Sequence, residues 1–382
     1  MEYFWNQIFV YTGSMNIFIL FKRPHWLYLL SFIGLLIWGS IAIFSATQSL
    51  YHETNFFQQH ILYLILGIVL FISVSMLSSD WVKVGSWLFY CFCVSLLLVL
   101  FAQNLLQGSE TPLRWIFVGP LSIQPSELMK IGLIVVLAKV YSESDAPSHL
   151  LFLQGLLITS IPVGLIAFQP DLGTAISLFM IFLIMTFFSR INFFYLLGLF
   201  LSSLGILWFF RQYLFHEYQW KRIVSFLNPE LDPTGENWSV RQALIAIGSG
   251  GLKGKGYLQG TQSKMGFLPD TKYSDFIFAV IGEEFGFFGC FMIIALFGVF
   301  LGSSLSIAFQ TKDLFQKFMV VGIVGMWLVQ IIINIGMNVG LLPVTGLPLP
   351  FVSYGGSALI ANFLCAGLIY HVHIHKGQIH YI

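Results

Sequence analysis

The chain has 382 residues, of which 57% are hydrophobic and only 9% are charged, and its formal net charge is +1. Its mean hydropathy of +0.83 indicates far more apolar surface than one soluble core of this length could bury. These values predict an integral membrane protein and exclude a soluble enzyme. The balanced charge gives no support for nucleic acid as a partner.

Apolar runs close to the roughly 20 residues that cross a bilayer as a helix recur along the whole chain. They lack the alternating pattern of an outer-membrane β-strand, so the expected fold is an all-α polytopic bundle. Residues 26–371 would form one membrane domain, between an amino-terminal segment (1–25) and a tail (372–382). Ten transmembrane helices are predicted, at residues 26–46, 60–79, 84–101, 126–141, 150–168, 172–189, 193–210, 275–309, 318–339 and 357–371.

The distribution of basic residues predicts the orientation of this bundle. In the short loops on one side of the membrane, the outer side, only Arg114 is basic. Cytoplasmic loops carry an excess of Lys and Arg, so the opposite side, with both termini, is predicted to be cytoplasmic. Residues 211–275, between the seventh and eighth spans, form a large extracytoplasmic loop, whose length frees it from this rule. The cytoplasmic basic residues are Lys22, Arg23, Lys83, Lys139, Arg190, Lys312, Lys317 and Lys376.

Two further features are the amino-terminal segment and a short helix expected within the large loop. Residues 1–21 lack the basic region and cleavage site of a signal peptide, and Met15 is an alternative start. Within the loop, residues 238–247 have helical apolar spacing, with Asn237 as a plausible N-cap. We therefore expect a short helix there that lies on the membrane surface.

Ionisable groups at membrane depth cost at least about 2.5 kcal/mol at a helix centre unless they are paired or hydrated. Glu127 and Lys130 stand at positions i and i+3 near the outer end of the fourth span, where they can pair. Two interpretations stay open for them: an ion pair that holds helices together, or part of a substrate cavity. Asp171 precedes the sixth span, where a structural N-cap is the favoured interpretation.

Residues 250–256, with the sequence GGLKGKG, combine flexible backbone amides with the ammonium groups of Lys253 and Lys255. This composition suits a phosphate group. It does not match a nucleotide P-loop, because no Ser or Thr follows the Gly-Lys pair and no strand precedes it. A solvated hinge is the alternative interpretation, and it is the more common use of such a loop.

Asp275 is the most informative single residue, as the first residue of the eighth span. A carboxylate at a helix N-terminus is stabilised by up to about 1 kcal/mol, which is a structural explanation. A general base would instead need its pKa raised by burial or by a nearby acid. Glu283 and Glu284 lie about 12 to 14 Å deeper along the helix, so we expect them to be structural or cavity-lining.

Several runs of sequence together resemble the SEDS family of shape, elongation, division and sporulation proteins, and most closely its rod-shape, RodA-like branch. The family's essential aspartate falls on Asp275. Departures from the family pattern are Asp270, Tyr273, Ser274 and Ala358, where Glu, His, Thr and Ser are usual. The matching runs lie at residues 114–116, 124–130, 169–174, 218–238, 246–263, 267–270, 274–286 and 334–357.

The resemblance implies a peptidoglycan glycosyltransferase of the bacterial inner membrane that polymerises lipid II during cell elongation and shape maintenance. Its partners would be lipid II, membrane lipid and a class B penicillin-binding protein that cross-links the product. Asp275 would be the base, and Glu127 and Lys130 would organise the cavity. The candidate contacts to the diphosphate or headgroup are Arg114, Arg222, Lys253 and Lys255.

Three alternatives stay open at this point. A divalent cation, Mg²⁺ or Mn²⁺, would replace or assist the lysines at the diphosphate, although no cluster of ligands marks a site for it. A lipid II carrier or flippase would also need intramembrane charges beside a polar headgroup. A non-catalytic scaffold for a penicillin-binding protein is the third alternative.

Overall fold

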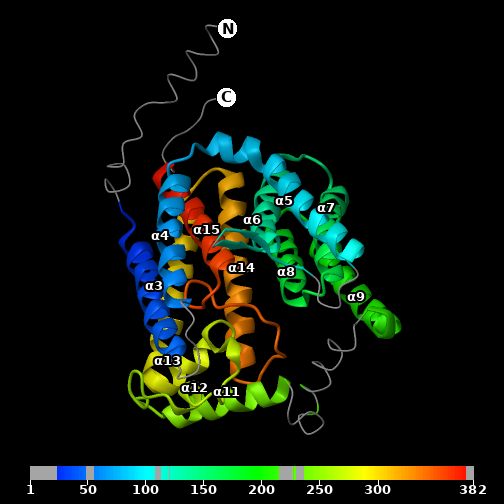
Figure 1. The fold of residues 1–382 in the computed structure, drawn as a ribbon. Helices are drawn as coiled ribbons and strands as arrows, with labels where there is room; N and C mark the ends of the chain where they lie inside the picture. The colour runs from blue at the N-terminus through cyan, green and yellow to red at the C-terminus, as the bar shows by residue number, and fades with distance from the viewer. Residues whose placement is uncertain are drawn as a thin grey trace.

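The computed structural model describes residues 24–48, 56–107, 113–119, 121–214 and 236–375, together with residues 226 and 228. It is a helical bundle (Figure 1). A two-stranded antiparallel hairpin, β1 (Ile116–Val118) and β2 (Leu121–Ile123), precedes α6 and was not predicted. The helices are α3 (Trp26–Thr47), α4 (Phe56–Ser75), α5 (Ser79–Gln107), α6 (Pro125–Glu143), α7 (Ser148–Phe168), α8 (Leu172–Phe188), α9 (Phe193–Leu214), α11 (Glu236–Gly250), α12 (Thr261–Lys264), the 3₁₀ helix η2 (Asp270–Tyr273), α13 (Ile277–Gln310), α14 (Leu314–Asn338) and α15 (Gly356–His375).

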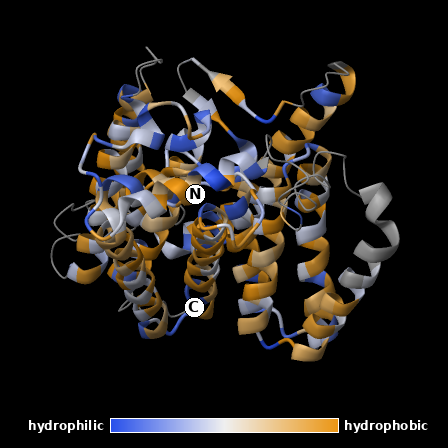
Figure 2. Ribbon diagram, turned by 90° about the horizontal axis from the view of Figure 1, so that it is seen from below, coloured by the Kyte–Doolittle hydropathy of each residue, from blue (hydrophilic) through white to orange (hydrophobic). Residues whose placement is uncertain are grey.

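Each of the ten expected spans lies on a helix, which confirms a multi-pass membrane protein. In the part of the chain that the structure describes, seven helices are long and apolar enough to cross a bilayer. They are α3, α4, α5, α7, α13, α14 and α15. The remaining three expected spans fall on α6, α8 and α9, so the count of ten crossings stays a prediction. Figure 2 shows that the helices are hydrophobic along most of their length.

Helices α14 and α15 form the interior of the bundle, and α14 runs through its middle in Figure 1. The most apolar windows of α14 and α15 are 78% and 83% buried, against 17% for α4. Two glycines let α14 approach α8 closely: a Cβ on Gly322 would lie 2.8 Å from Met185 Sδ, and one on Gly325 the same distance from Ile184. The indole of Trp327 donates to Asn362 Oδ1 at 2.8 Å and joins α14 to α15.

The loop between α14 and α15 is anchored in this interior. Phe351 is 1% exposed, has a φ of 63°, and packs its ring against Phe300 and Trp327 at centroid distances of 5.4 and 5.3 Å. A bulky residue adopts a positive φ only where its surroundings hold it there. Phe351 thereby anchors the loop between α14 and α15 to the interior of the bundle.

Helix α11 lies across an end of the bundle next to α13 (Figure 1) and confirms the predicted helix at residues 238–247. Ala243 and Ala246 are fully buried, and Gly282 of α13 faces Ile247 of α11. The prediction that Asn237 is the N-cap is wrong, because Asn237 lies within the helix. The capping argument used local sequence only, and the helix begins two residues earlier than predicted, at Glu236.

Candidate active site

Asp275 lies in the turn between η2 and α13, and its side chain is half-buried. The prediction that it begins the helix is wrong: α13 begins at Ile277, and Phe276 occupies the N-cap position without a side-chain bond. The 3₁₀ turn of residues 270–273 precedes the helix and shifts its start. The carboxylate therefore does not act as the N-cap of α13, which was the structural explanation offered by the sequence.

The backbone of Asp275 is held on both sides. Its N–H donates to Thr271 O at 2.8 Å. Its carbonyl oxygen accepts from Asn334 Nδ2 at 3.1 Å and from Asn338 Nδ2 at 2.9 Å. Both asparagines are fully buried in α14. Sequence reasoning missed them, although amides four residues apart in an apolar helix are a signal that could have found them.

The loop that follows α14 covers this turn. Tyr354 N–H donates to Tyr273 O at 2.9 Å, and Ser353 Oγ donates to Ser274 O. A Cβ on Gly346, whose φ is 74°, would lie 3.9 Å from Asp275 Oδ2, so the carboxylate faces the backbone at that glycine. The loop thus forms one wall beside the carboxylate.

The same loop connects Asp275 with the start of α8. A Cβ on Gly173 would lie 2.5 Å from Thr345 O, so the two backbones touch. Asp171 caps α8 by accepting from Thr174 N–H at 3.2 Å and Thr174 Oγ1 at 2.9 Å. The N-cap interpretation of Asp171 is confirmed. Gln124 Nε2 also donates to Asp171 Oδ2 at 3.2 Å and ties the start of α6 to this end of the bundle.

Arg114 lies at this end as well. Its guanidinium donates to Gln169 O at 3.1 Å and to Pro170 O at 2.9 Å. These bonds satisfy carbonyls where α7 ends and leave the group half-buried. Its contact with a headgroup stays a prediction.

Glu127 and Lys130 form the expected ion pair, with Lys130 Nζ 2.7 Å from Glu127 Oε2 and side-chain exposures of 1% and 6% for Lys130 and Glu127. Because both belong to α6, the pair compensates two buried charges within one helix. The pairing itself is confirmed, while a role in holding helices together and a role in organising a cavity both stay predictions.

The Gly- and Lys-rich segment, residues 250–256, packs into a break in α13. Gly286 has a φ of 65° and a ψ of −157°, which interrupts the helix. Lys255 and Gly256 N–H donate to Glu283 O and Glu284 O, each at 3.0 Å, and Phe287 N–H donates to Gly251 O at 2.9 Å. The segment therefore satisfies backbone groups that the break would leave unpaired.

Glu283 is the polar centre of this junction and is fully buried. Its Oε1 lies 2.7 Å from Lys255 Nζ and accepts from the N–H groups of Thr261 and Gln262, each at 2.7 Å. Its Oε2 accepts from Ser263 N–H at 3.0 Å. The expectation that Glu283 is structural agrees with this geometry, and Lys255 serves as its counterion.

Lys253 and Arg222 are the other predicted headgroup contacts. Lys253 is exposed on the same segment. Arg222 lies outside the described residues. Neither headgroup role is tested by these positions, so both stay predictions.

Two side chains of η2 have shifted pKa values. Burial, with the added effect of the Asp270 and Asp275 carboxylates, raises the pKa of Tyr273 above 10.0, so this phenol stays neutral beside Asp275. Burial lowers the pKa of Lys272 below 10.5, although nearby Asp270 opposes the shift. Lys272 Nζ donates to Ser263 O and connects η2 with α12.

In the described part of the chain, no three His, Cys, Asp or Glu side chains are gathered where they could hold a metal ion. The arrangement around Asp275 thus does not fit a preassembled site for Mg²⁺ or Mn²⁺.

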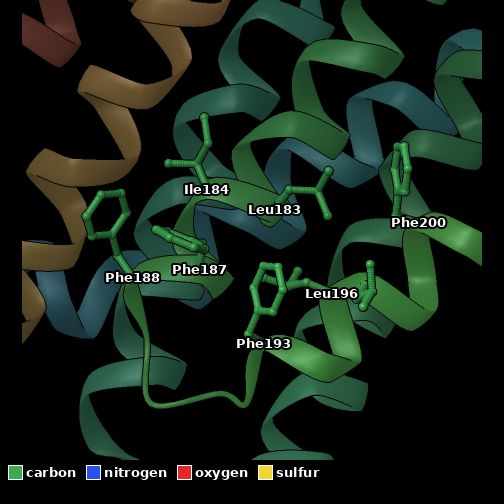
Figure 3. Close-up of a pocket in the computed structure, with 8 residues that line it drawn as sticks. Leu183, Ile184, Phe187, Phe188, Phe193, Leu196 and Phe200 are labelled. Carbon is green, nitrogen blue, oxygen red and sulfur yellow. The ribbon is translucent and has the colours of Figure 1, made fainter.

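An apolar pocket of about 350 Å³ lies between α8 and α9 (Figure 3). It is at the far end of α8 from Gly173, roughly 20 Å away at 1.5 Å per residue. The lining offers hydrocarbon contacts and no charged group. Its residues are Leu183, Ile184, Phe187, Phe188, Phe193, Leu196, Leu197 and Phe200.

Comparison with known proteins decides the family. The family model described as "Cell cycle protein", which covers FtsW, RodA and SpoVE, matches residues 23–378. The chain belongs to the FtsW/RodA/SpoVE family. Peptidoglycan glycosyltransferase MrdB of Escherichia coli K12 is 35% identical over 356 residues, which cover 92% of this chain and 94% of the relative. Peptidoglycan glycosyltransferase RodA of Treponema pallidum is 33% identical, with coverages of 81% and 88%.

Solved structures confirm the expected fold of this family member. A chain of a peptidoglycan synthase complex, described as coordinating polymerization and crosslinking, superposes with a TM-score of 0.79 at 26% identity. The match covers 94% of this chain and 100% of that chain. The crystal structure of Thermus thermophilus RodA gives a TM-score of 0.70 at 25% identity, with coverages of 94% and 99%.

Proposed function

We propose that this chain is a peptidoglycan glycosyltransferase that joins lipid II units into glycan strands, with Asp275 as general base. The observation that carries the assignment is the half-buried Asp275 carboxylate, held in a fixed turn at the end of the bundle. Relatives that cover most of the chain bear the name peptidoglycan glycosyltransferase, which supports the reaction class.

The reaction needs one accessible carboxylate. The 4-hydroxyl of one sugar attacks the anomeric carbon of another lipid-linked sugar, the bond to undecaprenyl diphosphate breaks, and the base takes the hydroxyl proton. Glu283 and Glu284 are at most 1% exposed and lie inside α13. Glu127 is paired with Lys130. Asp275 is therefore the best placed of these carboxylates to meet a hydroxyl group.

The leaving diphosphate needs positive charge or hydrogen-bond donors. Lys253, Arg114 and Arg222 are the proposed contacts, with Lys255 contributing only through its partly exposed ammonium. A divalent cation from solution would assist them if the substrate itself supplies ligands.

The proposed setting is the bacterial inner membrane, with both termini in the cytoplasm and residues 211–275 outside. The proposed partner is a class B penicillin-binding protein that cross-links the new strands. Support comes from the similar chain in a synthase complex that combines polymerization with crosslinking. A role in cell elongation and shape is part of the proposal, and the likeness to a solved RodA described as a rod shape determining protein supports it.

The test is polymerisation of labelled lipid II by the purified protein together with its penicillin-binding partner. Asp275→Asn keeps the size of the side chain and should lower the rate by about 10²- to 10⁴-fold. Asp313→Asn is the matched control: Asp313 caps α14 about 36 Å away, and Asn is an equally good cap. Wild-type polymerisation by Asp275→Asn would overturn the assignment.

The rival functions give different results in the same system. A lipid II carrier would move the headgroup into vesicles that lack a partner and would form no polymer. A non-catalytic scaffold would leave polymerisation dependent on its partner alone, so removal of this chain would not change the rate.

A further inference from the structure

Two asparagines four residues apart, Asn334 and Asn338, lie on one face of the apolar helix α14. Both are fully buried. An amide buried away from water costs free energy unless all its polar atoms find partners. The partners of these two amides therefore show what the pair is used for.

Three hydrogen bonds of the pair go to the segment around Asp275, and a fourth goes to the loop after α14. Asn338 Nδ2 donates to Asp275 O at 2.9 Å, and its Oδ1 accepts from Ala279 N–H at 3.2 Å. Asn334 Nδ2 donates to Asp275 O at 3.1 Å and to Leu347 O at 2.8 Å. Asn338 Nδ2 also donates to the backbone carbonyl of Asn334 at 2.8 Å, which fixes the orientation of the Asn338 side chain.

These bonds join three pieces of chain. One is the turn that contains Asp275, the second is the first turn of α13, and the third is the loop at residues 345–347. That loop faces the Asp275 carboxylate at Gly346. The pair thus sets the position of the carboxylate relative to the wall that it faces.

The carbonyls of the two residues before Asp275 are held as well, by Ser353 Oγ and Tyr354 N–H. Three successive carbonyl groups are thereby fixed by donors from α14 and the loop that follows it. A short side chain such as Asp follows its backbone closely, so a fixed backbone leaves the carboxylate little freedom.

We propose that Asn338 and Asn334 are positioning residues that hold the Asp275 carboxylate in the geometry needed for proton abstraction. The inference rests on the proposed function and adds to it the groups that preorganise the base. A displacement of about 1 Å in such a group lowers a rate by about 10²-fold, because the reacting atoms no longer meet at the right distance.

A structural role alone would predict something different. If the pair only stabilised the bundle, its loss would lower thermal stability and weaken lipid II binding along with turnover. If it positions the base, turnover falls while substrate affinity changes little, since Asp275 makes its main contribution in the transition state.

The variants Asn338→Leu and Asn334→Ala separate these outcomes. Leu matches Asn in shape, so Asn338→Leu removes the donors without leaving a large cavity. Asn334→Ala is the milder change, because Asn338 still donates to Asp275 O. The control is Asn362→Leu, which removes another buried amide, one whose Oδ1 accepts from Trp327 Nε1 of the same helix α14 at 2.8 Å.

The measurements are kcat and KM for lipid II polymerisation, lipid II affinity and the thermal midpoint of the complex with its partner. We expect kcat to fall about 10- to 100-fold in Asn338→Leu and several-fold in Asn334→Ala, with lipid II affinity within about threefold of wild type. The control should lose comparable thermal stability but keep kcat within about threefold.

Equal kcat for wild type and both variants would overturn the inference, as would parallel losses of affinity and kcat that match those of Asn362→Leu. If Asn338→Leu does not fold, Asn334→Ala decides alone. The proposed function is tested separately: it is rejected if Asp275→Asn polymerises lipid II at the wild-type rate. If Asp275→Asn is inactive while Asn338→Leu and Asn334→Ala are fully active, only the positioning role is rejected.

Discussion

Lys255 and Glu283 form an ion pair with 2.7 Å between Nζ and Oε1, and it joins the Gly- and Lys-rich segment to α13. The lysine is 25% exposed and the glutamate is fully buried. One of the two ammonium groups that suggested a phosphate site therefore neutralises a carboxylate of the protein itself. The other, Lys253, is exposed on the same segment.

Glu283→Gln should destabilise the protein. The amide keeps one acceptor for the N–H groups of Thr261 and Gln262 but leaves Lys255 without its counterion. Breaking a buried pair costs about 3–5 kcal/mol, and we expect the lower end because Lys255 can turn toward water. Thermal unfolding in detergent measures the effect, and Lys255→Met with Glu283→Gln completes a double-mutant cycle. Independent, additive losses in the cycle would contradict the pairing.

Gly286→Ala should disrupt the junction between residues 250–256 and α13. A Cβ at this position would lie 2.4 Å from Gly254 N, and the φ of 65° is unfavourable for any residue with a side chain. We expect a loss of about 2 kcal/mol or more in unfolding free energy. Gly298→Ala is the control, because a Cβ there meets nothing within 4 Å. Equal stability of the two variants would show that the break does not depend on glycine.

Lys253→Gln should weaken lipid II binding without affecting the fold, since Lys253 is exposed. One exposed ion pair contributes up to about 1 kcal/mol, which corresponds to roughly a fivefold change in affinity at low salt. The difference from wild type should disappear as ionic strength rises, because salt screens exposed charges. An unchanged affinity at low salt would favour the hinge interpretation of residues 250–256. Lys255 is left unchanged in this test, because its substitution would also remove the counterion of Glu283.

The buried Lys272 predicts a specific dependence of stability on pH. Burial lowers its pKa in the folded state below the ordinary 10.5, so the unfolded chain binds more protons between these two pKa values. Stability should therefore rise with pH in that window and be lowest below it, where the folded state holds a buried charge. The difference in thermal midpoint between wild type and Lys272→Met, measured from pH 7 to 10, should increase with pH. A decrease would show that Lys272 is better stabilised as a cation in the folded state.

Local features of the site were predictable because they depend on neighbours in the sequence. Asp171 and Thr174 are three residues apart, as are Glu127 and Lys130, and helical geometry alone brings each pair together. The start of α13 was predicted two residues early, because the 3₁₀ turn before it has no strong signal in the sequence. The hairpin at residues 116–123 was missed for the same reason, since its strands have three residues each.

The sequence by itself determined the membrane class, the positions of the helices and the family, because apolar runs and contiguous motifs are properties of the linear chain. Only the tertiary structure decided what surrounds Asp275 and what the glycines do. Asn338 meets Asp275 across 63 residues, and Lys255 meets Glu283 across 28. Such contacts depend on how helices pack and where α13 breaks, and periodicity along one segment carries no information about which distant segment will lie against it.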